Sequence, residues 1–578
     1  MRIKLSPVMG AAMALWGCSA AWAASPDREV LPVSIVWNVG FGSNVYVTGG
    51  HPDLGNWTPT GAVKLRWTSG NIWTGRIAVQ KGVTLAYKFI ARSGASNQHC
   101  NGANVLWEPD PNRTNHIAPA PVAPFAGKSI YYYSGWTTAF LLYTSGGNTN
   151  FFSIPLVNIG PGREPGESLY HASGFGEAGE WIQFVLTNSL GQIDRAPYTN
   201  GVGFLGRDYW TPLDAFVLQQ GQLYSYWPSN TVSAQRFESR YVDSSYPPIS
   251  GRTVRIILPR GYDSHPWKRY PVIYFQDGQN LTNGANPGGT GAWNADITST
   301  IEISQGRMRE AIIVGVDNYP ERRRWEYNPP GDTYPGELPG RADAYLQFLI
   351  NNVRPTIDTH YRTLNDPRNT LIGGSSMGGI CSLYAGLETN VFGGVLAMSP
   401  AVTRAPNYNA SLPGKPKRET RIYMDTGTDE GQIGTLPGGY YWDEPWSAYD
   451  HLLTIGYVPN LDLLMRIGCG HGHNEAAWRA RLPGAFRFLL DVRDEPNRLA
   501  HLSAPPALRT LQREGTQLTA GHDALAHQRY ELDSAPSPSG PWTPVVTTAP
   551  IAAAWSYPVV TGTVGDAAAI LRLRAVAD

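Results

Sequence analysis

Residues 368–384 constrain the fold of this chain more than any other segment. An apolar run that ends at Ile372 leads into Gly374-Ser375-Ser376-Met377-Gly378, and apolar residues then recur at helical spacing as far as Leu387. Strand, sharp turn and helix are the context in which Gly-x-Ser-x-Gly exposes a nucleophilic serine. Glycine is needed on both sides because a Cβ would collide with the closely packed strand and helix. We therefore expect Ser376 at a strained apex; the alternative is a glycine-rich turn without chemistry.

Two later loops carry the residue types that a serine nucleophile requires. The first contains Asp429 and Glu430, and the second contains His471 and His473. A serine hydroxyl needs a base within hydrogen-bond reach, and that base needs a carboxylate to fix its tautomer and stabilise its charged form. The order serine, acid, histidine is that of α/β-hydrolases. The residues alone leave both pairs of candidates open.

The stretch 236–493 alternates between short apolar runs and amphipathic segments, a pattern typical of a doubly wound, mainly parallel sheet. The expected strands are 253–258, 272–275, 311–316, 370–372, 395–398, 421–424 and 463–467. The expected helices are 342–353, 446–453 and 475–490. We therefore predict an α/β-hydrolase domain over this stretch.

Three motifs in this stretch carry a family resemblance: Tyr270-Pro-Val-Ile-Tyr-Phe-Gln-Asp-Gly-Gln279, the turn at Ser376, and His473-Asn-Glu-Ala-Ala-Trp478. Residues 255–490 resemble the esterase family that includes esterase D, the feruloyl and acetylxylan esterases of carbohydrate esterase family 1, and the antigen 85 acyltransferases. The resemblance implies His473 as the base, because a tryptophan follows it by five residues. It implies Glu430 as the acid, with Asp429 as the alternative.

Acyl transfer also needs two N–H donors aimed at the tetrahedral oxyanion. We expect one from the backbone of Met377 and the other from Gln279, with Asn280 as the alternative. Trp293, Arg324, Trp325 and Tyr327 are expected on loops that converge at the substrate rim. The long loop 403–420, which contains several Pro and Lys residues, is a candidate lid.

Residues 27–120 read as a small β-sandwich with short strands and Gly, Pro and Asn turns. Its motifs, in order, are Tyr46-Val-Thr-Gly-Gly50, Leu54-Gly-Asn-Trp57, Tyr87-Lys-Phe89 and Trp107-Glu108. They resemble the family 20 carbohydrate-binding modules, which bind starch. The resemblance implies one α-glucan site at Trp57, Lys88 and Trp107. It implies a second near Phe41, Trp67 and Trp73, although Trp73 lies in a strand, where burial is an open alternative.

Two further modules flank the hydrolase domain. Residues 129–235, after a proline-rich connector at 119–128, read as a second β-rich module that faintly resembles carbohydrate-binding family 25; its aromatic residues could instead pack against the hydrolase. Residues 498–578 read as a small C-terminal β-sandwich that resembles fibronectin type III domains. We expect no catalytic residue in the C-terminal module, and carbohydrate binding is a candidate role for the module at 129–235.

The N-terminus is typical of export. Arg2 and Lys4 precede an apolar run, and Ala21-Trp22-Ala23 offers a cleavage site, so residues 1–23 are a predicted signal peptide and the mature protein is expected outside the cytoplasm. A lipoprotein signal at Cys18 is the minor alternative. No apolar run is long enough to span a bilayer. Cys100, Cys381 and Cys469 would remain, and we expect buried free thiols, with a Cys381–Cys469 approach as the alternative.

The amino-acid composition narrows the classes of partner that we expect the protein to bind. The chain has 46 basic and 46 acidic residues and only 16% charged residues, which argues against nucleic acid or an anionic membrane. No ligand set recurs at metal spacing beyond the pair His471 and His473, so we expect neither metal nor cofactor. The sequence thus predicts an exported esterase that binds starch or a related α-glucan. The alternatives are a glucan-binding protein with an inactive hydrolase domain and an acyltransferase that uses the same three residues.

Overall fold

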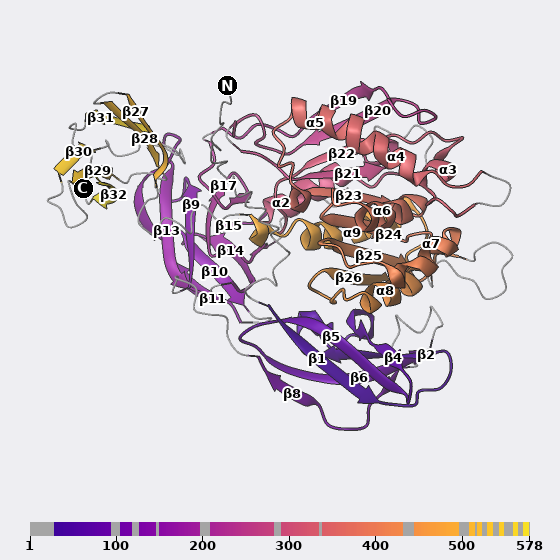
Figure 1. The fold of residues 1–578 in the computed structure, drawn as a ribbon. Coiled ribbons are helices and arrows are strands. Elements are labelled where there is room, and N and C mark those ends of the chain that lie inside the picture. Colours follow the sequence, from indigo (N-terminus) through magenta and orange to yellow (C-terminus); the bar gives the residue numbers. More distant parts are fainter. Residues whose placement is uncertain are drawn as a thin grey trace, which may run out of the picture.

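The computed structural model describes the chain from Arg28 to Glu495, apart from several short segments, and six strands beyond it. The described ranges are 28–93, 105–117, 127–145, 150–177, 179–196, 208–229, 231–266, 268–282, 291–333, 338–431, 444–495, 508–514, 517–522, 529–535, 543–547, 559–563 and 570–576. The predicted signal peptide and most of the proline-rich connector lie outside them. Figure 1 shows a large α/β body with β modules attached to it.

The α/β body is built on one sheet of eight strands with the order β19-β20-β22-β21-β23-β24-β25-β26. These strands are β19 (Arg236–Val242), β20 (Arg252–Leu258), β21 (Val272–Gln276), β22 (Ile312–Val316), β23 (Thr370–Ser375), β24 (Gly394–Met398), β25 (Arg421–Gly427) and β26 (Leu463–Gly468). β19 and β20 pair antiparallel at one edge, and the six strands from β22 to β26 run parallel. The four central parallel strands, β22, β21, β23 and β24, are buried on both faces. Because the six strands run in one direction, their carboxyl ends lie at one edge of the sheet.

Helices cover both faces of this sheet. They are α2 (Ala295–Ser304), α3 (Arg323–Tyr327), α4 (Ala342–Phe348), α5 (Arg354–His360), α6 (Met377–Glu388), α7 (Pro406–Ser411), α8 (Glu444–Thr454) and α9 (Glu475–Leu489). One apolar core contains side chains of α4, α6, α7 and α8, and a second contains side chains of α2 and α9. Short helical turns complete the body: η3 (Gly278–Asn280), η4 (Leu349–Val353), η5 (Pro367–Asn369), η6 (Val402–Arg404), η7 (Leu412–Gly414) and η9 (Val492–Asp494).

The expected elements of this body are confirmed, with two differences. All seven expected strands and the helices near 446–453 and 475–490 are present within a few residues. The expected helix 342–353 continues through η4 and α5 to His360, because Pro355 lies near the start of α5, where its missing N–H costs little. The sequence pattern missed β19, whose alternation of charged and aromatic residues suits an exposed edge strand.

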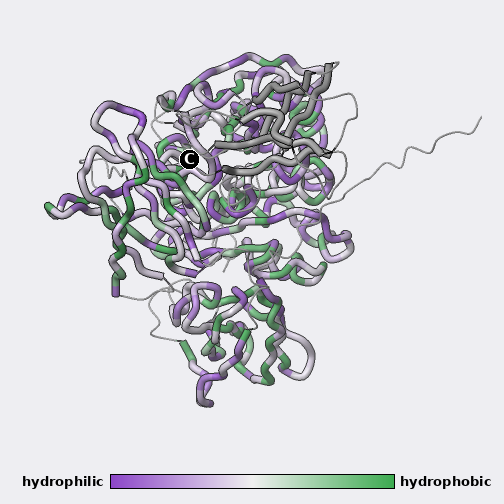
Figure 2. The backbone as a smooth tube through the Cα atoms, turned by 90° about the vertical axis from the view of Figure 1, so that its left-hand side faces the viewer, coloured by the Kyte–Doolittle hydropathy of each residue, from purple (hydrophilic) through white to green (hydrophobic). Residues whose placement is uncertain are grey.

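The N-terminal module is a two-sheet β-sandwich. Its sheets have the orders β1-β5-β4 and β3-β2-β6-β7, with β8 also paired to β6. The elements are β1 (Arg28–Val36), β2 (Ser43–Gly49), η1 (Pro52–Leu54), η2 (Pro59–Gly61), β3 (Val63–Lys64), β4 (Arg66–Thr68), β5 (Ile72–Gln80), β6 (Thr84–Ser93), β7 (Leu106–Trp107) and β8 (Arg113–His116). In the rotated view of Figure 2 it again forms a separate lobe below the rest of the molecule.

Direct contacts join this lobe to the α/β body. Lys64, whose side chain is buried, places Nζ 2.6 Å from Asp450 on α8. The Ala78 N–H donates to the Pro459 carbonyl at 3.0 Å, and the Asn460 side-chain amide donates to the Asp53 carbonyl at 2.8 Å. The module therefore rests on the region around α8 and β26 and is not held by its linker alone.

The second β module is also a two-sheet sandwich, with the orders β12-β13-β9-β17-β18 and β11-β10-β14-β15, and with β16 paired to β14. Its strands are β9 (Lys128–Ser134), β10 (Phe140–Ser145), β11 (Phe152–Pro155), β12 (Val157–Pro161), β13 (Ser168–Phe175), β14 (Ile182–Thr187), β15 (Ile193–Asp194), β16 (Tyr209–Thr211), β17 (Ala215–Gln219) and β18 (Gln222–Tyr224). Tyr226 and Trp227 after β18 are buried, and the Tyr226 hydroxyl donates to Glu310 of the α/β body at 2.7 Å. Tyr226 thus packs the module against the α/β body, whereas Trp227 packs on Tyr131 and Tyr133 of the module itself.

Beyond residue 507 the structure describes two three-stranded sheets, β27-β28-β31 and β30-β29-β32. The strands are β27 (Leu508–Glu514), β28 (Gln517–His522), β29 (Arg529–Ala535), β30 (Thr543–Thr547), β31 (Val559–Thr563) and β32 (Ile570–Val576). The likeness to fibronectin type III domains remains a prediction.

Two expectations about this body are wrong. Cys381 is a buried free thiol as expected, but Cys469 is in a disulfide, and its partner is not Cys381. Cys100 lies outside the described residues. The candidate lid 403–420 is not a loose loop: it contains α7 and η7, and Tyr408 and Leu412 on them are buried in the apolar core. Apolar anchoring of this kind holds the segment in place.

Candidate functional site

Ser376 lies at the turn between β23 and α6 with φ 56° and ψ −120°, a conformation rarely adopted by residues other than glycine. The expected need for glycine is confirmed at Gly374, and the space at Gly378 is tight. A Cβ on Gly374 would lie 2.8 Å from the Gly378 carbonyl, and one on Gly378 would lie 3.2 Å from the side chain of Gln276. Ser376 is half-buried, and the backbone N–H of Met377 stands at the first position of α6, where a helix offers it no acceptor.

His473 and Glu430 form a direct contact at the same edge of the sheet. Glu430 Oε2 lies 3.1 Å from His473 Nδ1. The carboxylate follows β25 and the imidazole follows β26, so neighbouring parallel strands deliver both. The Glu430 side chain is fully buried, whereas the His473 side chain is 22% exposed. A buried carboxylate on Nδ1 favours the tautomer whose Nε2 can accept a proton.

Glu430 is held from behind by groups of three different elements. Its Oε1 accepts the Gly427 N–H at 2.6 Å, and it also accepts the hydroxyl of Ser399 and a guanidinium N–H of Arg481. Ser399 follows β24 and Arg481 lies on α9. Sequence reasoning missed both residues. The signal that could have found Arg481 is its helical spacing from Trp478, which places an arginine on the sheet-facing side of α9, where it requires a carboxylate.

The two unselected residues of the sequence analysis lie apart from this contact. Asp429 is exposed, although it is adjacent to Glu430. His471 is half-buried, its carbonyl accepts the Asp429 N–H at 3.0 Å, and burial lowers the pKa of its imidazole. Of the two carboxylates, Glu430 therefore faces the imidazole and Asp429 does not. Of the two histidines, His473 faces the carboxylate and His471 does not.

The loop after β21 contains Gln279 and Asn280, the two residues considered for the second N–H donor. Asp277, at φ 57°, receives a two-pronged contact from Arg323, with Nε at 2.8 Å and Nη2 at 2.7 Å. The Gln279 side chain accepts the Asn318 N–H at 3.1 Å, which ties η3 to the segment that follows β22. The Asn280 N–H donates to the Asp277 carbonyl at 2.9 Å and is thus engaged, whereas Gln279 N–H has no acceptor among the described residues.

Glu475 is a further carboxylate at this edge that the sequence analysis did not single out. It lies in the first turn of α9, and its Oε1 accepts the Asn280 side-chain amide at 3.2 Å. Burial raises its pKa, and His473 is among the charged groups that act on it. Glu475 therefore connects the η3 loop with the helix that follows His473.

The expected aromatic rim is wrong for two of its members. Trp293 is 2% exposed and packs on Trp478, with ring centroids 6.1 Å apart. Tyr327 is fully buried on α3, which extends over residues expected to form a loop. Both rings complete the core beneath the site, because an aromatic side chain at a buried position gains more from packing than from contact with a ligand.

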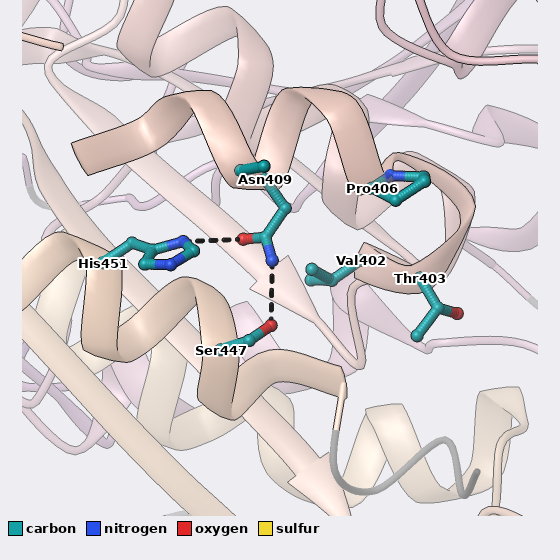
Figure 3. Close-up of a pocket in the computed structure, with 7 residues that line it drawn as sticks. Val402, Thr403, Pro406, Asn409, Ser447 and His451 are labelled. Atoms are coloured by element: carbon teal, nitrogen blue, oxygen red, sulfur yellow. Dashed lines mark hydrogen bonds between the residues drawn. The ribbon is translucent and has the colours of Figure 1, made fainter. Parts of the chain in front are cut away.

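A pocket of about 420 Å³ lies between η6, α7 and α8, and η6 directly follows Ala401, which is hydrogen-bonded to the turn at Ser376, here called the elbow. Figure 3 shows Asn409 in the middle of one wall, where its amide lies 3.3 Å from His451 Nδ1 and donates to the Ser447 hydroxyl at 3.0 Å. Val402, Pro406 and Ala410 contribute apolar surface. The pocket is fixed relative to the elbow, because the N–H of Ala401, just before η6, donates to the Ser376 carbonyl at 3.0 Å.

On the N-terminal module, Trp57 and Trp107 face each other with ring centroids 6.5 Å apart and planes inclined by 40°. Trp107 is 39% exposed, and Trp57 sits at φ 62° in the turn after η1. Gly50 is required opposite it, since a Cβ there would lie 3.0 Å from the Trp57 indole nitrogen. Lys88 Nζ donates to the Glu108 carbonyl at 3.3 Å, next to Trp107 in sequence. The structure thus brings Trp57 and Trp107 together.

Trp73 does not join them. It is 5% exposed, lies in the apolar core of the module, and its indole N–H donates to the Trp37 carbonyl at 2.9 Å. The inclusion of Trp73 among the carbohydrate-binding residues is therefore corrected: its side chain faces inward on β5. Its cross-strand partner Trp67 is 52% exposed.

Within the described ranges, no group of three or more His, Cys, Asp or Glu side chains is arranged to hold a metal ion. In the same ranges, no helix is long and apolar enough to cross a bilayer.

Family models match two parts of the chain. Residues 31–121 match the model described as “Starch binding domain”, and residues 249–501 match the model described as “Putative esterase”. Residues 31–121 coincide with the module that carries Trp57 and Trp107, and residues 249–501 contain the Ser376 turn and the Glu430–His473 contact.

Two individual relatives each match part of the chain. The chain is 37% identical over 73 residues to an alpha-amylase of Streptomyces violaceus, a match that covers 13% of this chain and only 12% of that protein. It is 24% identical over 191 residues to the uncharacterized protein YbbA of Bacillus subtilis (strain 168), covering 31% of this chain and 70% of that protein.

Among solved structures, a ferulic acid esterase from Anaeromyces mucronatus aligns with 23% identity and a TM-score of 0.33, over 47% of this chain and 97% of that one. An IroE-like serine hydrolase from Shewanella oneidensis aligns with 21% identity and a TM-score of 0.36, over 44% of this chain and 80% of that one. The chain therefore combines a region that matches the starch-binding domain model with a region that matches the putative esterase model.

Proposed function

We propose that the α/β body, residues 236–493, hydrolyses a carboxylic ester through an acyl-enzyme on Ser376. In this proposal His473 is the general base and then the general acid, and Glu430 orients it. The observation that carries the proposal is the 3.1 Å contact between Glu430 and His473, at the sheet edge where the elbow presents Ser376. A strained serine, an imidazole and a buried carboxylate at one edge are the groups that acyl transfer requires.

The reaction would proceed in two steps, acylation of Ser376 and hydrolysis of the acyl-enzyme. Ser376 Oγ attacks the ester carbonyl carbon while His473 Nε2 accepts the hydroxyl proton, and the tetrahedral intermediate collapses when His473 returns that proton to the departing alcohol. A water molecule then attacks the acyl-enzyme, with His473 again taking and returning the proton. The products are a carboxylic acid and an alcohol, and the enzyme is regenerated without any cofactor.

Two backbone N–H groups are assigned to the developing oxyanion, those of Met377 and Gln279. Support comes from the first-position N–H of α6 and from the engagement of the Asn280 N–H elsewhere. The positive end of α6 adds to the field at the same place. The Arg323–Asp277 pair would hold the η3 loop at the distance that such donors need.

The N-terminal module is proposed to hold the enzyme on starch or a related α-glucan through Trp57, Trp107 and Lys88. Flat sugar faces stack on indole rings, and a lysine ammonium donates to hydroxyls. With residues 1–23 as a signal peptide, the protein would work outside the cytoplasm, where such polymers are accessible. Attachment to a polymer raises the local concentration of an ester carried by it.

The pocket beside the elbow is proposed to receive the alcohol part of the ester. Its volume of about 420 Å³ lies within the usual range for small-molecule sites, and Asn409 and His451 offer hydrogen bonds of the kind that sugar hydroxyls form. A glycosyl alcohol is therefore the substrate class that this wall favours.

The direct test is turnover of p-nitrophenyl acetate and methyl ferulate by the full chain beside Ser376→Ala, with Ser375→Ala as the neighbouring-serine control. We expect the Ser376→Ala variant to lose at least about 10⁴-fold in kcat/KM. Phenylmethylsulfonyl fluoride should label the peptide at Ser376 with loss of fluoride, and mass spectrometry can locate the adduct.

Equal rates for the wild type and Ser376→Ala on every short ester would refute the hydrolase proposal in favour of a glucan-binding protein. Transfer of the acyl group to added glucan, with little free acid, would instead identify an acyltransferase using the same serine.

A further inference from the structure

Three buried charges stand behind His473. The side chains of Asp425 and Glu430 are fully buried, and that of Arg481 is 4% exposed. Arg481 Nε lies 3.0 Å from Asp425 Oδ2, and its Nη2 lies 3.3 Å from Glu430 Oε1. A single guanidinium thus bridges a carboxylate inside β25 and the carboxylate that contacts the imidazole. A buried ion set is a poor source of stability by itself, so its presence here calls for another role.

We propose that Arg481 is a positioning residue for Glu430, and that Asp425 and Arg481 together with Glu430 set the strength of His473 as a base. The inference rests on the proposed function for its effect on rate, but its effect on the imidazole can be measured without turnover.

The hydroxyl of Ser399 makes the arrangement rigid. It donates to Glu430 Oε1 and accepts both the Trp478 indole N–H at 3.0 Å and an Arg481 N–H at 2.7 Å, which fills its hydrogen-bonding capacity. Its own N–H donates to Asp425 Oδ1 at 3.0 Å, and its φ of 39° is strained. In this strained conformation the Ser399 N–H reaches Asp425 while the Ser399 hydroxyl reaches Glu430. These contacts block rotation of the Glu430 carboxylate on the side away from His473.

Asp425 is surrounded by donors. In addition to Arg481 and the Ser399 N–H, it accepts the Tyr423 hydroxyl at 3.1 Å, so we infer that it is ionised despite burial, which raises its pKa. Burial acts to lower the pKa of Arg481, but Asp425 and Glu430 outweigh it and raise that pKa, so the guanidinium keeps its charge.

Counting charges then gives the functional consequence. Asp425, Glu430 and Arg481 sum to one negative charge, which is balanced only when His473 carries a proton. That is the state formed when the imidazole takes the serine proton. The other titratable or charged groups around this set are Tyr423 on β25, Glu475 on α9, and His471 and Asp429 in the two loops. Of the groups on β25 and α9, Asp425 is the one that shares the Arg481 guanidinium with Glu430.

The first experiment removes the bridge. Arg481→Met leaves two buried carboxylates without their cation, so one should bind a proton, and kcat/KM for p-nitrophenyl acetate should fall about 100-fold or more with KM little changed. Arg481→Lys restores the charge without the fork and should recover part of the loss. Arg479→Met is the matched control, because Arg479 lies on the same helix and contacts the Ala292 carbonyl and neither carboxylate.

The second experiment changes charge without changing size. Asp425→Asn removes one negative charge, so Glu430 and Arg481 together are neutral before the imidazole is protonated. The acid limb of the pH profile of kcat/KM should therefore move to lower pH by about one unit. In the Ser376→Ala background, the ¹⁵N-histidine titration of His473, assigned with His473→Gln, should move in the same direction. This readout survives even if the chain hydrolyses no ester, so failure of the proposed function and failure of this inference are distinguishable.

A purely structural role predicts a different result: a lower melting temperature, but an unmoved acid limb and an unmoved imidazole titration in folded Asp425→Asn. That outcome overturns the proposal. Equal loss of kcat/KM in Arg481→Lys and Arg481→Met, both folded by circular dichroism, would also overturn the role given to the charge.

Discussion

The two candidate sites of this protein are built from opposite kinds of surface. On the N-terminal module, Trp57 and Trp107 present apolar rings, and Trp107 is 39% exposed. On the α/β body, the side chain of Glu430 is fully buried and receives hydrogen bonds from a loop, a neighbouring strand end and a helix. The first site depends on aromatic rings that remain in contact with water. The second depends on a charged group that is buried away from water.

The difference follows from what each site is proposed to do. Stacking on a sugar releases water from apolar surface and tolerates small shifts, so an exposed turn can carry it. Proton transfer depends on a charge held at fixed distance in a medium of low dielectric, where electrostatic interactions are strong and misplacement is costly. Variants of the two sites should therefore differ in the size and in the kind of loss that they cause.

The largest effect is expected at the buried carboxylate. Glu430→Gln should lower kcat/KM for short esters about 10³-fold, because an amide can present an N–H to His473 Nδ1 and favour the wrong tautomer. Asp429→Asn is the matched control and should retain activity within a small factor, since Asp429 is exposed. A large loss in Asp429→Asn with little loss in Glu430→Gln would exchange their roles. Steady-state kinetics with p-nitrophenyl acetate decides.

The exposed site should show a smaller loss that is confined to binding. Trp57→Ala with Trp107→Ala should weaken retention on granular starch by about 10- to 100-fold, the loss expected when stacking by one or two large apolar side chains is removed. Turnover of p-nitrophenyl acetate should be unchanged. Trp67→Ala is the comparison variant, because Trp67 is a tryptophan of the same module that is 52% exposed but is paired with the buried Trp73 and not with Trp57 or Trp107. Unchanged starch retention in the double variant would refute the assignment.

The N-terminal module also contains an enclosed charge, which tests whether burial alone distinguishes the two regions. Burial acts to raise the pKa of Asp53, but Arg28 at 2.9 Å and His51 outweigh it and hold the pKa well below its usual range. A depressed folded pKa means that the stabilisation is present above the unfolded value near 4 and is lost as the pH falls through the folded value.

Asp53→Asn should therefore lower the free energy of unfolding of the module by about 1–2 kcal/mol at pH 7, and the difference from wild type should shrink as the pH falls below about 4. Urea unfolding followed by tryptophan fluorescence measures it, with the exposed Asp110→Asn as control. A difference that persists unchanged at pH 2 would contradict the ion-pair explanation.

The smallest effect is expected at the pocket beside the elbow. Asn409→Ala should raise KM about 3- to 10-fold for an acetylated or feruloylated sugar, as the loss of one hydrogen bond predicts, and leave p-nitrophenyl acetate unaffected. Asn407→Ala on the same helix is the control, because Asn407 bonds to Gly331 outside the pocket. Equal KM values for the sugar ester in wild type and Asn409→Ala would remove the pocket from the proposed substrate path.

Sequence reasoning was accurate where the constraint is local. Apolar periodicity predicted the strands and helices of the α/β body, and steric exclusion at Gly374 and Gly378 predicted the turn at Ser376. It was inaccurate where exposure decides. Trp73 and Trp293 have the same chemistry as Trp57, yet their positions on β5 and beside α2 turn them inward. No local pattern separates these cases, because burial depends on which distant segment covers the ring.

The order of serine, acid and histidine was readable from the amino-acid sequence by itself, as was the strand, turn and helix that set Ser376 apart, since these depend on residues a few positions apart. Only the tertiary structure decided which of two adjacent carboxylates turns toward His473, and that Arg481 and Ser399 stand behind it. The physical reason is that a buried charge must find its partners, and β24, β25 and α9 supply them from positions separated by tens of residues.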